Sequence, residues 1–477
     1  MIPWFLIATT TAAASSPLKL SYEQALQQAL SVNPALMNAR FDVDAADGAL
    51  LAAKGVFDPT LNASSAGNQF TSESTREFGE VITEFKSFNW QAGVDQFFPT
   101  GTRVGLDWST TSTRFKYELR GSGMVVESEE PLYESRMAAT LTQSLLDGHR
   151  LSSNLEGVRQ ASRAKDISEA TQVATRQQSL ADTASAYWNS RTQQKLAEIA
   201  RAAVDTAKEE QRIVYAKVEQ GTLAPVEKAR VDALAVQAER EFLTAVDMAK
   251  NTEDSLLLLI GESPGTPLEL TTEPAEPIAL TLDLSTIENA ALDNNADLLV
   301  ARLNEDSKGM AYRDARHKRL PQLDLNASYA LIGYEPQMSA AASELFGGDL
   351  PEWSIGGTFS MPLLNRADRG QALQASAQAA KAKSERMTLE RNIRSQVRTQ
   401  ARAVEAAFLQ VSLARANLEL ADKTLSADRS LADAGRVIQK DLLESIRGVD
   451  DARAQLEQAK VDYQLAIIEL ERLKGTL

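Results

Sequence analysis

Cysteine is absent from this chain of 477 residues, and histidine occurs only twice, as His149 and His317. Without cysteine there are no disulfides and no thiolate metal ligands, and two distant histidines form no cluster with metal-ligand spacing. The sequence also lacks the serine–histidine–aspartate order of hydrolases and a glycine-rich phosphate loop. We therefore expect no catalytic residues, no bound metal, no cofactor and no enzymatic activity.

Long apolar runs are missing too, since the densest apolar stretch, residues 256–260, is far too short for a membrane-spanning helix. Aromatic residues make up only 6% of the chain although hydrophobic residues make up 43%, which favours helices packed through small side chains. The net charge of −15 argues against nucleic acid as a partner, because nucleic-acid binders present a basic face. Residues 1–14, with an apolar core at 2–8, are typical of a signal peptide.

The rest of the chain is a tandem duplication. Segment 33–40 (NPALMNAR) recurs at 295–302 (NADLLVAR), and the same offset of 262 residues carries Pro59 onto Pro321. In both copies the patterns predict a short helix, a medium helix, strands, a very long helix, a turn and a second medium helix. The protein therefore consists of two versions of one structural unit.

The helix starts and the segment boundaries follow from this order. Ser21 with Gln24, and Ser285 with Glu288, have capping-box spacing at the first helix of each repeat, and Asn33 before a proline predicts the next helix start. The predicted segments are a signal peptide (1–14), helices (18–56), strands (57–146) and a helical hairpin (147–261) of the first repeat, a proline-rich linker (262–284), and helices (285–320), strands (321–363) and a helical hairpin (364–477) of the second.

The two longest helical stretches, residues 151–220 and 368–434, contain no proline and almost no glycine. In the second, small and apolar residues alternate spacings of four and three from Ile393 to Leu425, which is a coiled-coil seam. A helix of about 69 residues spans roughly 100 Å at ~1.5 Å per residue. Because one thin chain cannot bury the seams of such helices, we expect the chain to self-associate.

Between the helices, at residues 60–145 and 322–362, the hydrophobic period changes from 3.6 to 2. In residues 102–110, for example, apolar and polar side chains alternate, and each such run has about the ten-residue length of a tilted membrane strand. Sheet edges are not tolerated in lipid, so membrane strands would close into a β-barrel. A soluble β-sandwich with its apolar faces inside explains the alternation equally well.

Aromatic residues favour the membrane interpretation. They gather near the ends of the predicted strands, as the interfacial girdle of a membrane barrel requires; the clearest are Phe88, Trp90, Trp108, Trp353 and Phe359. A tight turn at 99–101 contrasts with long polar loops at 71–86 and 115–134, which is the topology of outer-membrane barrels. We therefore expect outer-membrane lipid to contact the apolar strand faces.

Four motifs resemble the TolC-like outer-membrane factor family: LSYEQAL at 20–26, FDPTL at 57–61, LTQSLLD at 141–147 and QGTLAPV at 220–226. The resemblance covers the chain after the signal segment. It implies a mixed fold, a homotrimer with one shared transmembrane β-barrel in the cell outer membrane, continued into the periplasm by a long α-helical coiled-coil barrel. It also implies a passive exit duct for an efflux pump or a type I secretion system, with a periplasmic adaptor (membrane fusion) protein and an inner-membrane transporter as partners.

The number of strands is less simple. The family usually has four strands per chain and twelve per trimer, whereas the alternation here gives about six, because residues 88–98 and 102–112 form an additional pair. Six per chain would give eighteen per trimer. On the strength of the resemblance we expect four strands per chain.

The resemblance also assigns adaptor contacts at the periplasmic tip, where each long helix turns back. They are Gly221, Thr222, Leu223 and Ala224 in the first repeat, and Gly435, Arg436, Val437 and Ile438 in the second. Each glycine is equally well explained as a helix C-cap. An exposed apolar side chain beside such a cap would also offer the adaptor a contact.

Asp441 and Glu444 match the pair of acids that narrows the closed tip in this family, and so imply a channel gate. Three residues apart on a helix, they share one face, and a trimer would present six carboxylates that favour cations. Acids in the first turn of any helix also complement its dipole. Glu227 matches a gate acid whose arginine partner would stand at Val437, although here the arginine is the adjacent Arg436.

Two functions from different classes therefore compete. One is the trimeric exit duct. The other is a soluble periplasmic coiled-coil scaffold carrying a β-rich insert that packs on itself. The aromatic strand residues and the ordered motifs favour the duct.

Overall fold

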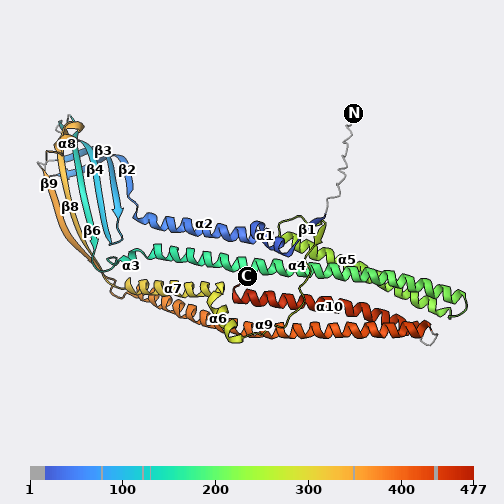
Figure 1. The fold of residues 1–477 in the computed structure, drawn as a ribbon. Helices are drawn as coiled ribbons and strands as arrows, with labels where there is room; N and C mark the ends of the chain where they lie inside the picture. The colour runs from blue at the N-terminus through green and yellow to red at the C-terminus, as the bar shows by residue number, and fades with distance from the viewer. Residues whose placement is uncertain are drawn as a thin grey trace, which may run out of the picture. The chain divides into compact units, whose positions relative to one another are not determined.

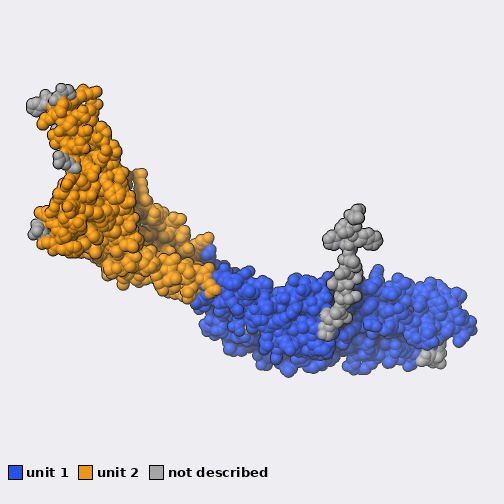
Figure 2. Space-filling model, turned by 90° about the horizontal axis from the view of Figure 1, so that it is seen from above, with its two compact units in different colours: residues 1–43, 167–302, 385–477 blue, residues 44–166, 303–384 orange. Residues whose placement is uncertain are grey.

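The computed structural model describes residues 17–76, 79–120, 123–128, 130–347, 350–433 and 439–476. The predicted signal peptide and the second tip turn, residues 435–438, lie outside them. The chain divides into two compact units, coloured separately in Figure 2. Unit 1 comprises Met1–Val43, Ile167–Arg302 and Glu385–Leu477, and unit 2 comprises Asp44–Asp166 and Leu303–Ser384.

Two long helical hairpins make up most of unit 1 (Figure 1). Helix α4 (Glu156–Glu219) turns back into α5 (Val226–Leu259), and α9 (Arg366–Asp433) is followed by α10 (Gln439–Lys474). Helices α4 and α9 contain 64 and 68 residues without interruption. The prediction of two very long helices from proline-free sequence is therefore confirmed.

The predicted coiled-coil seam lies between α9 and α10. Ile393, Val397 and Val404 of α9 are buried with Tyr463 and Leu470 of α10. The expectation that one chain could not bury this seam is therefore wrong, because the returning helix of the same repeat covers it. The prediction of self-association therefore applies to other faces of these helices.

The remaining helices of each repeat keep the predicted order. They are α1 (Tyr22–Val32) and α2 (Pro34–Lys54) in the first repeat, and α6 (Leu284–Asn294) and α7 (Ala296–His317) in the second. Before them stand β1 (Leu18–Leu20) and β7 (Leu268–Leu270), which pair in parallel. Short pieces complete this part of the chain: a 3₁₀ turn (Gly55–Phe57) and α3 (Leu151–Asn154).

The starts of the helices test the capping residues predicted from the sequence. The Ser21 hydroxyl accepts a hydrogen bond from the Gln24 amide at 3.3 Å, and the Gln24 side chain accepts one from the Ser21 amide at 2.9 Å, so this capping box is confirmed. Asn33 caps α2 by accepting from the Ala35 amide at 2.9 Å. The predicted box at Ser285 is wrong. Asp283 caps α6 instead, because its carboxylate accepts from the Ser285 amide at 3.1 Å.

Unit 2 is built around one antiparallel sheet (Figure 1). Its strands follow the spatial order β2 (Thr60–Arg76), β3 (Gly79–Phe97), β4 (Thr102–Leu119), β6 (Leu132–Ser144), β8 (Gln322–Glu335) and β9 (Pro351–Ser360), and the short β5 (Met124–Glu127) pairs only with β4. The expectation of four strands per chain is therefore wrong. The additional pair suggested by the alternation is present as β3 and β4, bonded on both sides.

Helix α8 (Met338–Glu344) interrupts the second-repeat strands, where the sequence had suggested only strands. Its Ala341 is fully buried. Gly333 of β8 makes room for it, since a Cβ at this glycine would lie 2.3 Å from the Ala341 carbonyl oxygen. Among the helices that the structure describes, none has both the length and the apolar composition to cross a membrane.

An ion pair in unit 1 gives a pH-dependent test of the packing. The buried Glu288 of α6 accepts a hydrogen bond from Arg398 Nε of α9 at 2.6 Å, and this bond lowers the pKa of its carboxyl below the usual value. The pair therefore stabilises the fold at pH values above the usual pKa of a carboxyl group. This stabilisation is lost as the pH falls through the lowered pKa of Glu288. We expect Glu288→Gln to lower Tm at pH 7, with a difference from wild type that shrinks in acid.

Differential scanning calorimetry of the purified protein between pH 3 and pH 7 measures this. The matched control is Glu239→Gln, at an exposed position on α5. A Tm difference for Glu288→Gln that stays constant over this pH range would contradict the assigned role of the pair.

Candidate functional site

The register of the strands gives the sheet one apolar and one polar face, because successive side chains along a strand point to opposite sides. One transverse row on the apolar face contains Leu61, Val94, Leu106, Ala139, Tyr329 and Trp353, one from each long strand. The adjacent row on the polar face contains Thr60, Asp95, Gly105, Thr140, Ser328 and Ser354. The apolar row is uncovered in the single chain, and Trp353 is 70% exposed.

All five aromatics singled out from the sequence lie on the apolar face of the sheet; they are Phe88, Trp90, Trp108, Trp353 and Phe359. Trp90 and Trp108 contact each other edge to face, with ring centroids 5.1 Å apart. The prediction that they lie near strand ends is wrong for this pair, which lies in the middle of β3 and β4. Residues 71–76, 79–86 and 115–119, expected in loops, continue the strands, so that β3 and β4 contain 19 and 18 residues rather than about ten. Their role at a membrane interface stays a prediction.

The two faces exchange character toward the β2–β3 turn. On the side that is apolar elsewhere, charged residues such as Lys86 appear. On the other side Phe70 stacks on Phe85 with centroids 5.0 Å apart, and Phe115 lies beside Tyr117 at 5.3 Å. The apolar band therefore ends near the middle of the three longest strands.

The first tip turn is held by its own backbone. Gly221 has a φ of 73°, a conformation that favours glycine, and ends α4 as a C-cap. The Thr222 amide and hydroxyl both donate to the Lys217 carbonyl, at 2.9 and 2.7 Å. Gly221, Thr222 and Ala224 are exposed, so three of the four predicted contact residues of this turn are accessible in the chain.

The apolar side chains of this turn differ from the sequence expectation. Leu223 is half-buried against the apolar cluster that joins α4, α5 and α10. Val226, at the first position of α5, is 57% exposed and is the accessible apolar side chain. Its place at the end of the QGTLAPV motif was the signal for it. The second turn, with Gly435, Arg436, Val437 and Ile438, lies outside the described residues.

The two predicted gate acids lie on one side of α10. Asp441 and Glu444 are exposed, whereas Leu442, Leu443 and Ile446 are buried on the opposite side of the helix. The chain thus leaves both carboxylates facing away from its own core. If several copies were arranged around a symmetry axis with this side of α10 facing the axis, their carboxylates would lie close together.

The third residue predicted for the gate, Glu227, has a partner in its own helix. Its Oε1 accepts a hydrogen bond from Arg230 Nη1 at 2.7 Å. Its Oε2 is buried and has no hydrogen-bond partner among the described residues. Arg230 was missed from the sequence, although a spacing of three along a helix is the usual signal for such a pair. The predicted partner positions, Arg436 and Val437, are not described.

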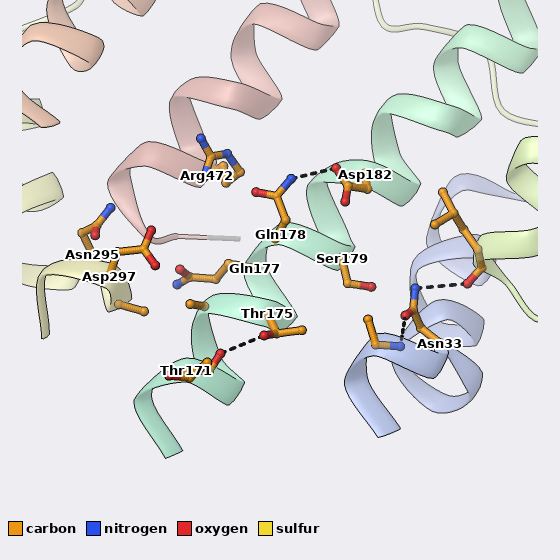
Figure 3. Close-up of a pocket in the computed structure, with 14 residues that line it drawn as sticks. Asn33, Thr171, Thr175, Gln177, Gln178, Ser179, Asp182, Asn295, Asp297 and Arg472 are labelled. Atoms are coloured by element: carbon orange, nitrogen blue, oxygen red, sulfur yellow. Dashed lines mark hydrogen bonds between the residues drawn. The ribbon is translucent and has the colours of Figure 1, made fainter. Parts of the chain in front are cut away.

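A cavity of about 400 Å³, lined mainly by polar residues, lies in unit 1. It is found where α4 passes the junction between α1 and α2 and the junction between α6 and α7. The duplicated Asn33 and Asn295 both line it. Figure 3 shows Ser179 on the side of α4 toward Asn33, and its buried hydroxyl has no hydrogen-bond partner among the described residues. On the other side of α4, Arg472 lies near Asp297. The cavity was not predicted from the sequence, although the recurrence of asparagine at both helix junctions could have indicated it.

The charges around this cavity are balanced within the fold. Glu469 accepts two hydrogen bonds from Arg472, at 2.6 and 2.7 Å, and these bonds raise the pKa of the Arg472 guanidinium. Asp297 and Asp182 add to this effect. No group of three or more potential metal ligands occurs among the described residues. The cavity can hydrogen-bond a small polar molecule, but it offers no nucleophile paired with a base.

The conformation of the tip turn can be tested directly. Gly221→Ala places a side chain at positive φ, which costs roughly 1 kcal/mol, so we expect a lower Tm. Gly448→Ala is the control, because Gly448 lies in the interior of α10 with open space around it and alanine favours a helix by roughly 0.5–1 kcal/mol. Calorimetry that shows the same shift for both variants would contradict the assigned cap.

The sequence profile of one family, described as outer membrane efflux protein, matches residues 25–262 and 288–476. No curated protein matches this chain significantly. Several solved structures share the fold at low identity, and three of them are compared below. Their similarity extends over nearly the whole chain.

The Campylobacter jejuni CmeC outer membrane channel is 16% identical, with a TM-score of 0.69 over 95% of this chain and 85% of that chain. CusC is 15% identical, with a TM-score of 0.71 over 95% and 92%. The outer membrane protein VceC from Vibrio cholerae is 15% identical, with a TM-score of 0.68 over 95% and 96%. The resemblance drawn from the four motifs is thereby confirmed, and the chain belongs to the outer membrane efflux protein family.

Proposed function

We propose that this chain is the exit duct of a tripartite efflux pump. Three copies share one β-barrel in the outer membrane and one α-helical coiled-coil barrel in the periplasm. The observation that carries the proposal is the sheet, whose apolar face is largely uncovered and whose edge strands β2 and β9 each pair with one strand only among the described residues. Lipid accepts an apolar face but no unpaired edge, so the edges must pair with other copies.

The helices support association through faces other than the buried seam. Leu409, Leu413 and Leu420 of α9 are about 60% exposed and spaced by four and seven residues. Val236 and Leu243 of α5, seven apart, are exposed to similar extents. Apolar residues at such spacing form the contact stripe of a coiled coil, so each chain carries a second set of stripes for its neighbours.

The competing soluble scaffold fits less well. Its β-insert would pack its apolar face internally, but Leu61, Trp353 and Ile355 are each about 70% exposed in the chain. Helix α8, which contacts β6 and β8, covers only a part of the sheet. A duct for type I secretion would use the same geometry, and the match to an efflux family supports the pump.

The partners follow from the position of the tip. A duct without its own energy source needs an inner-membrane transporter, joined to it by a periplasmic adaptor protein. The adaptor contacts the tip turns, at Gly221 to Ala224 with the exposed Val226 beside them, and at Gly435 to Ile438 in the second repeat. Asp441, Glu444 and Glu227 form the gate behind these turns. Transport through the duct is passive.

The lipid contact can be tested with neighbouring residues of β9. Ile355 lies on the apolar face and Ser354 on the polar face. Arginine on a lipid-facing position near the bilayer midplane costs roughly 2–4 kcal/mol. We therefore expect Ile355→Arg to reduce the trimer recovered from outer membranes and Ser354→Arg to leave it near the wild-type level. Equal recovery of both variants would contradict a lipid-facing role for this surface.

The gate can be tested by conductance. With both carboxylates removed, in Asp441→Ala with Glu444→Ala, the proposed constriction loses its charge, so single-channel conductance in planar bilayers should rise and cation preference should fall. Asp205→Ala, an exposed position on α4, is the control. Conductance and selectivity like those of the wild type in the double variant would remove these residues from the gate.

A further inference from the structure

We infer that the β3–β4 hairpin is part of the membrane wall, so that the trimer closes a barrel of eighteen strands. Six long strands per copy lie in one continuous sheet. Four per copy, with the hairpin outside the wall, would give twelve. The inference rests on the proposed trimeric duct and specifies the width of its membrane section.

The hairpin completes both faces of the sheet. Val94 and Leu106 stand between Leu61 of β2 and Ala139 of β6 in the apolar row, and all four side chains are exposed on the same side. Removal of the hairpin from the wall would break this row. It would also break the backbone pairing of β2 with β3 and of β4 with β6, which extends over all of β2 and nearly all of β6.

Side chains fasten the hairpin to the strands on each side. Asn62 of β2 donates to the carboxylate of Asp95 in β3 at 2.8 Å. On the opposite edge the hydroxyls of Thr110 in β4 and Ser135 in β6 are hydrogen-bonded at 2.8 Å, and both residues are buried. A hairpin that lay outside the wall would need neither contact.

Two glycines provide the closest fit. A Cβ at Gly105 of β4 would lie 2.6 Å from Thr140 Oγ1 of β6 and 2.9 Å from Asp95 Oδ1 of β3. A Cβ at Gly93 of β3 would lie 2.2 Å from Asp107 Oδ1 of β4. Polar side chains of three strands therefore share one closely packed layer, and the absence of side chains at both glycines makes this layer possible.

The strand directions allow closure. Successive long strands are antiparallel and their number is even, so the first, β2, and the last, β9, run in opposite directions. An edge β9 can therefore pair with β2 of the next copy as an antiparallel neighbour. All eighteen strands then alternate in direction, as in closed membrane barrels.

The added strands determine the size of the lumen. With strands about 4.8 Å apart and tilted by about 40°, an eighteen-stranded barrel has a backbone diameter of roughly 36 Å, against roughly 24 Å for twelve strands. Barrels of about this strand number leave an aqueous channel. The membrane section then admits bulky hydrated cargo, and the size limit lies in the helical section.

The absence of cysteine makes disulfide trapping in the full-length protein unambiguous. Directly opposed positions in a sheet lie close enough for a disulfide. We expect disulfides for Ala63→Cys with Ala92→Cys, across β2 and β3, and for Leu106→Cys with Ala139→Cys, across β4 and β6, in trimers from outer membranes. Ala63→Cys with Ala139→Cys, on strands separated by β3 and β4, should stay reduced.

The outcomes separate this inference from the proposed function. A disulfide between positions 63 and 139 in a trimer would mean that β2 pairs with β6; the eighteen-stranded barrel would be overturned and the duct would stand. A chain that forms no trimer in the outer membrane would contradict the duct itself. Formation of the two expected disulfides in trimers, with the third pair reduced, supports both.

Labelling from outside the cell gives an independent measurement of width. Asp107→Cys lies on the polar face and Trp108→Cys on the apolar face of the same strand. Charged maleimide reagents should label the first and not the second. Polymer-linked maleimides too large for a twelve-stranded lumen should still label Asp107→Cys. Equal labelling of both positions, or exclusion of these larger reagents, would overturn the inference.

Discussion

Water and lipid make opposite demands on the sheet of unit 2, and the rest of the structure depends on how both are met. Its apolar face is costly in water, while its two unpaired edges are costly in lipid. In the proposed trimer, pairing of β9 with β2 of another copy removes the edges and lets lipid cover the apolar face. The polar face, with Asp95, Thr140 and Ser354, is then enclosed around water.

The helices meet a related demand at two levels. Within a chain, the seam between α9 and α10 buries Val397, Val404 and Tyr463, and so gives each hairpin its own stability. The stripe with Leu409 and Leu420 remains exposed. Folding of the chain and assembly of the proposed trimer therefore use different faces of the same helices. The residues buried in one process are not needed for the other.

Periodicity predicted most of the fold, because helices and strands bury side chains at different spacings. It failed where a second group competed for the same role: Asp283 replaced Ser285 as a cap, and the returning α10 buried a seam that had seemed to need another chain. The expected strand number was wrong because the family resemblance was preferred over the alternation at 88–112. Helix α8 gave no strong signal, since it needs Gly333 beneath it, a tertiary contact.

For the tip, sequence could name the turn but not its exposed side chains. Leu223 and Val226 are both apolar, and only the packing against α4 and α10 decides that the first is half-buried and the second accessible. The pairing of Glu227 with Arg230 follows the same rule, because a resemblance assigned the acid a distant partner while its own helix supplied a nearer one.

The unequal strand lengths have a consequence at the cell surface. Strand β3 has 19 residues and β9 only 10, and the apolar band ends near the middle of the longer strand. In the proposed duct, at about 3.3 Å per residue, the additional residues extend three strands of each copy above the lipid as a raised rim. Its outer side carries charges such as Lys86, and its inner side the aromatic rings of Phe70 and Phe85. Antibodies and bacteriophages that approach the cell would contact this charged rim first, whereas departing cargo would pass the aromatic rings last.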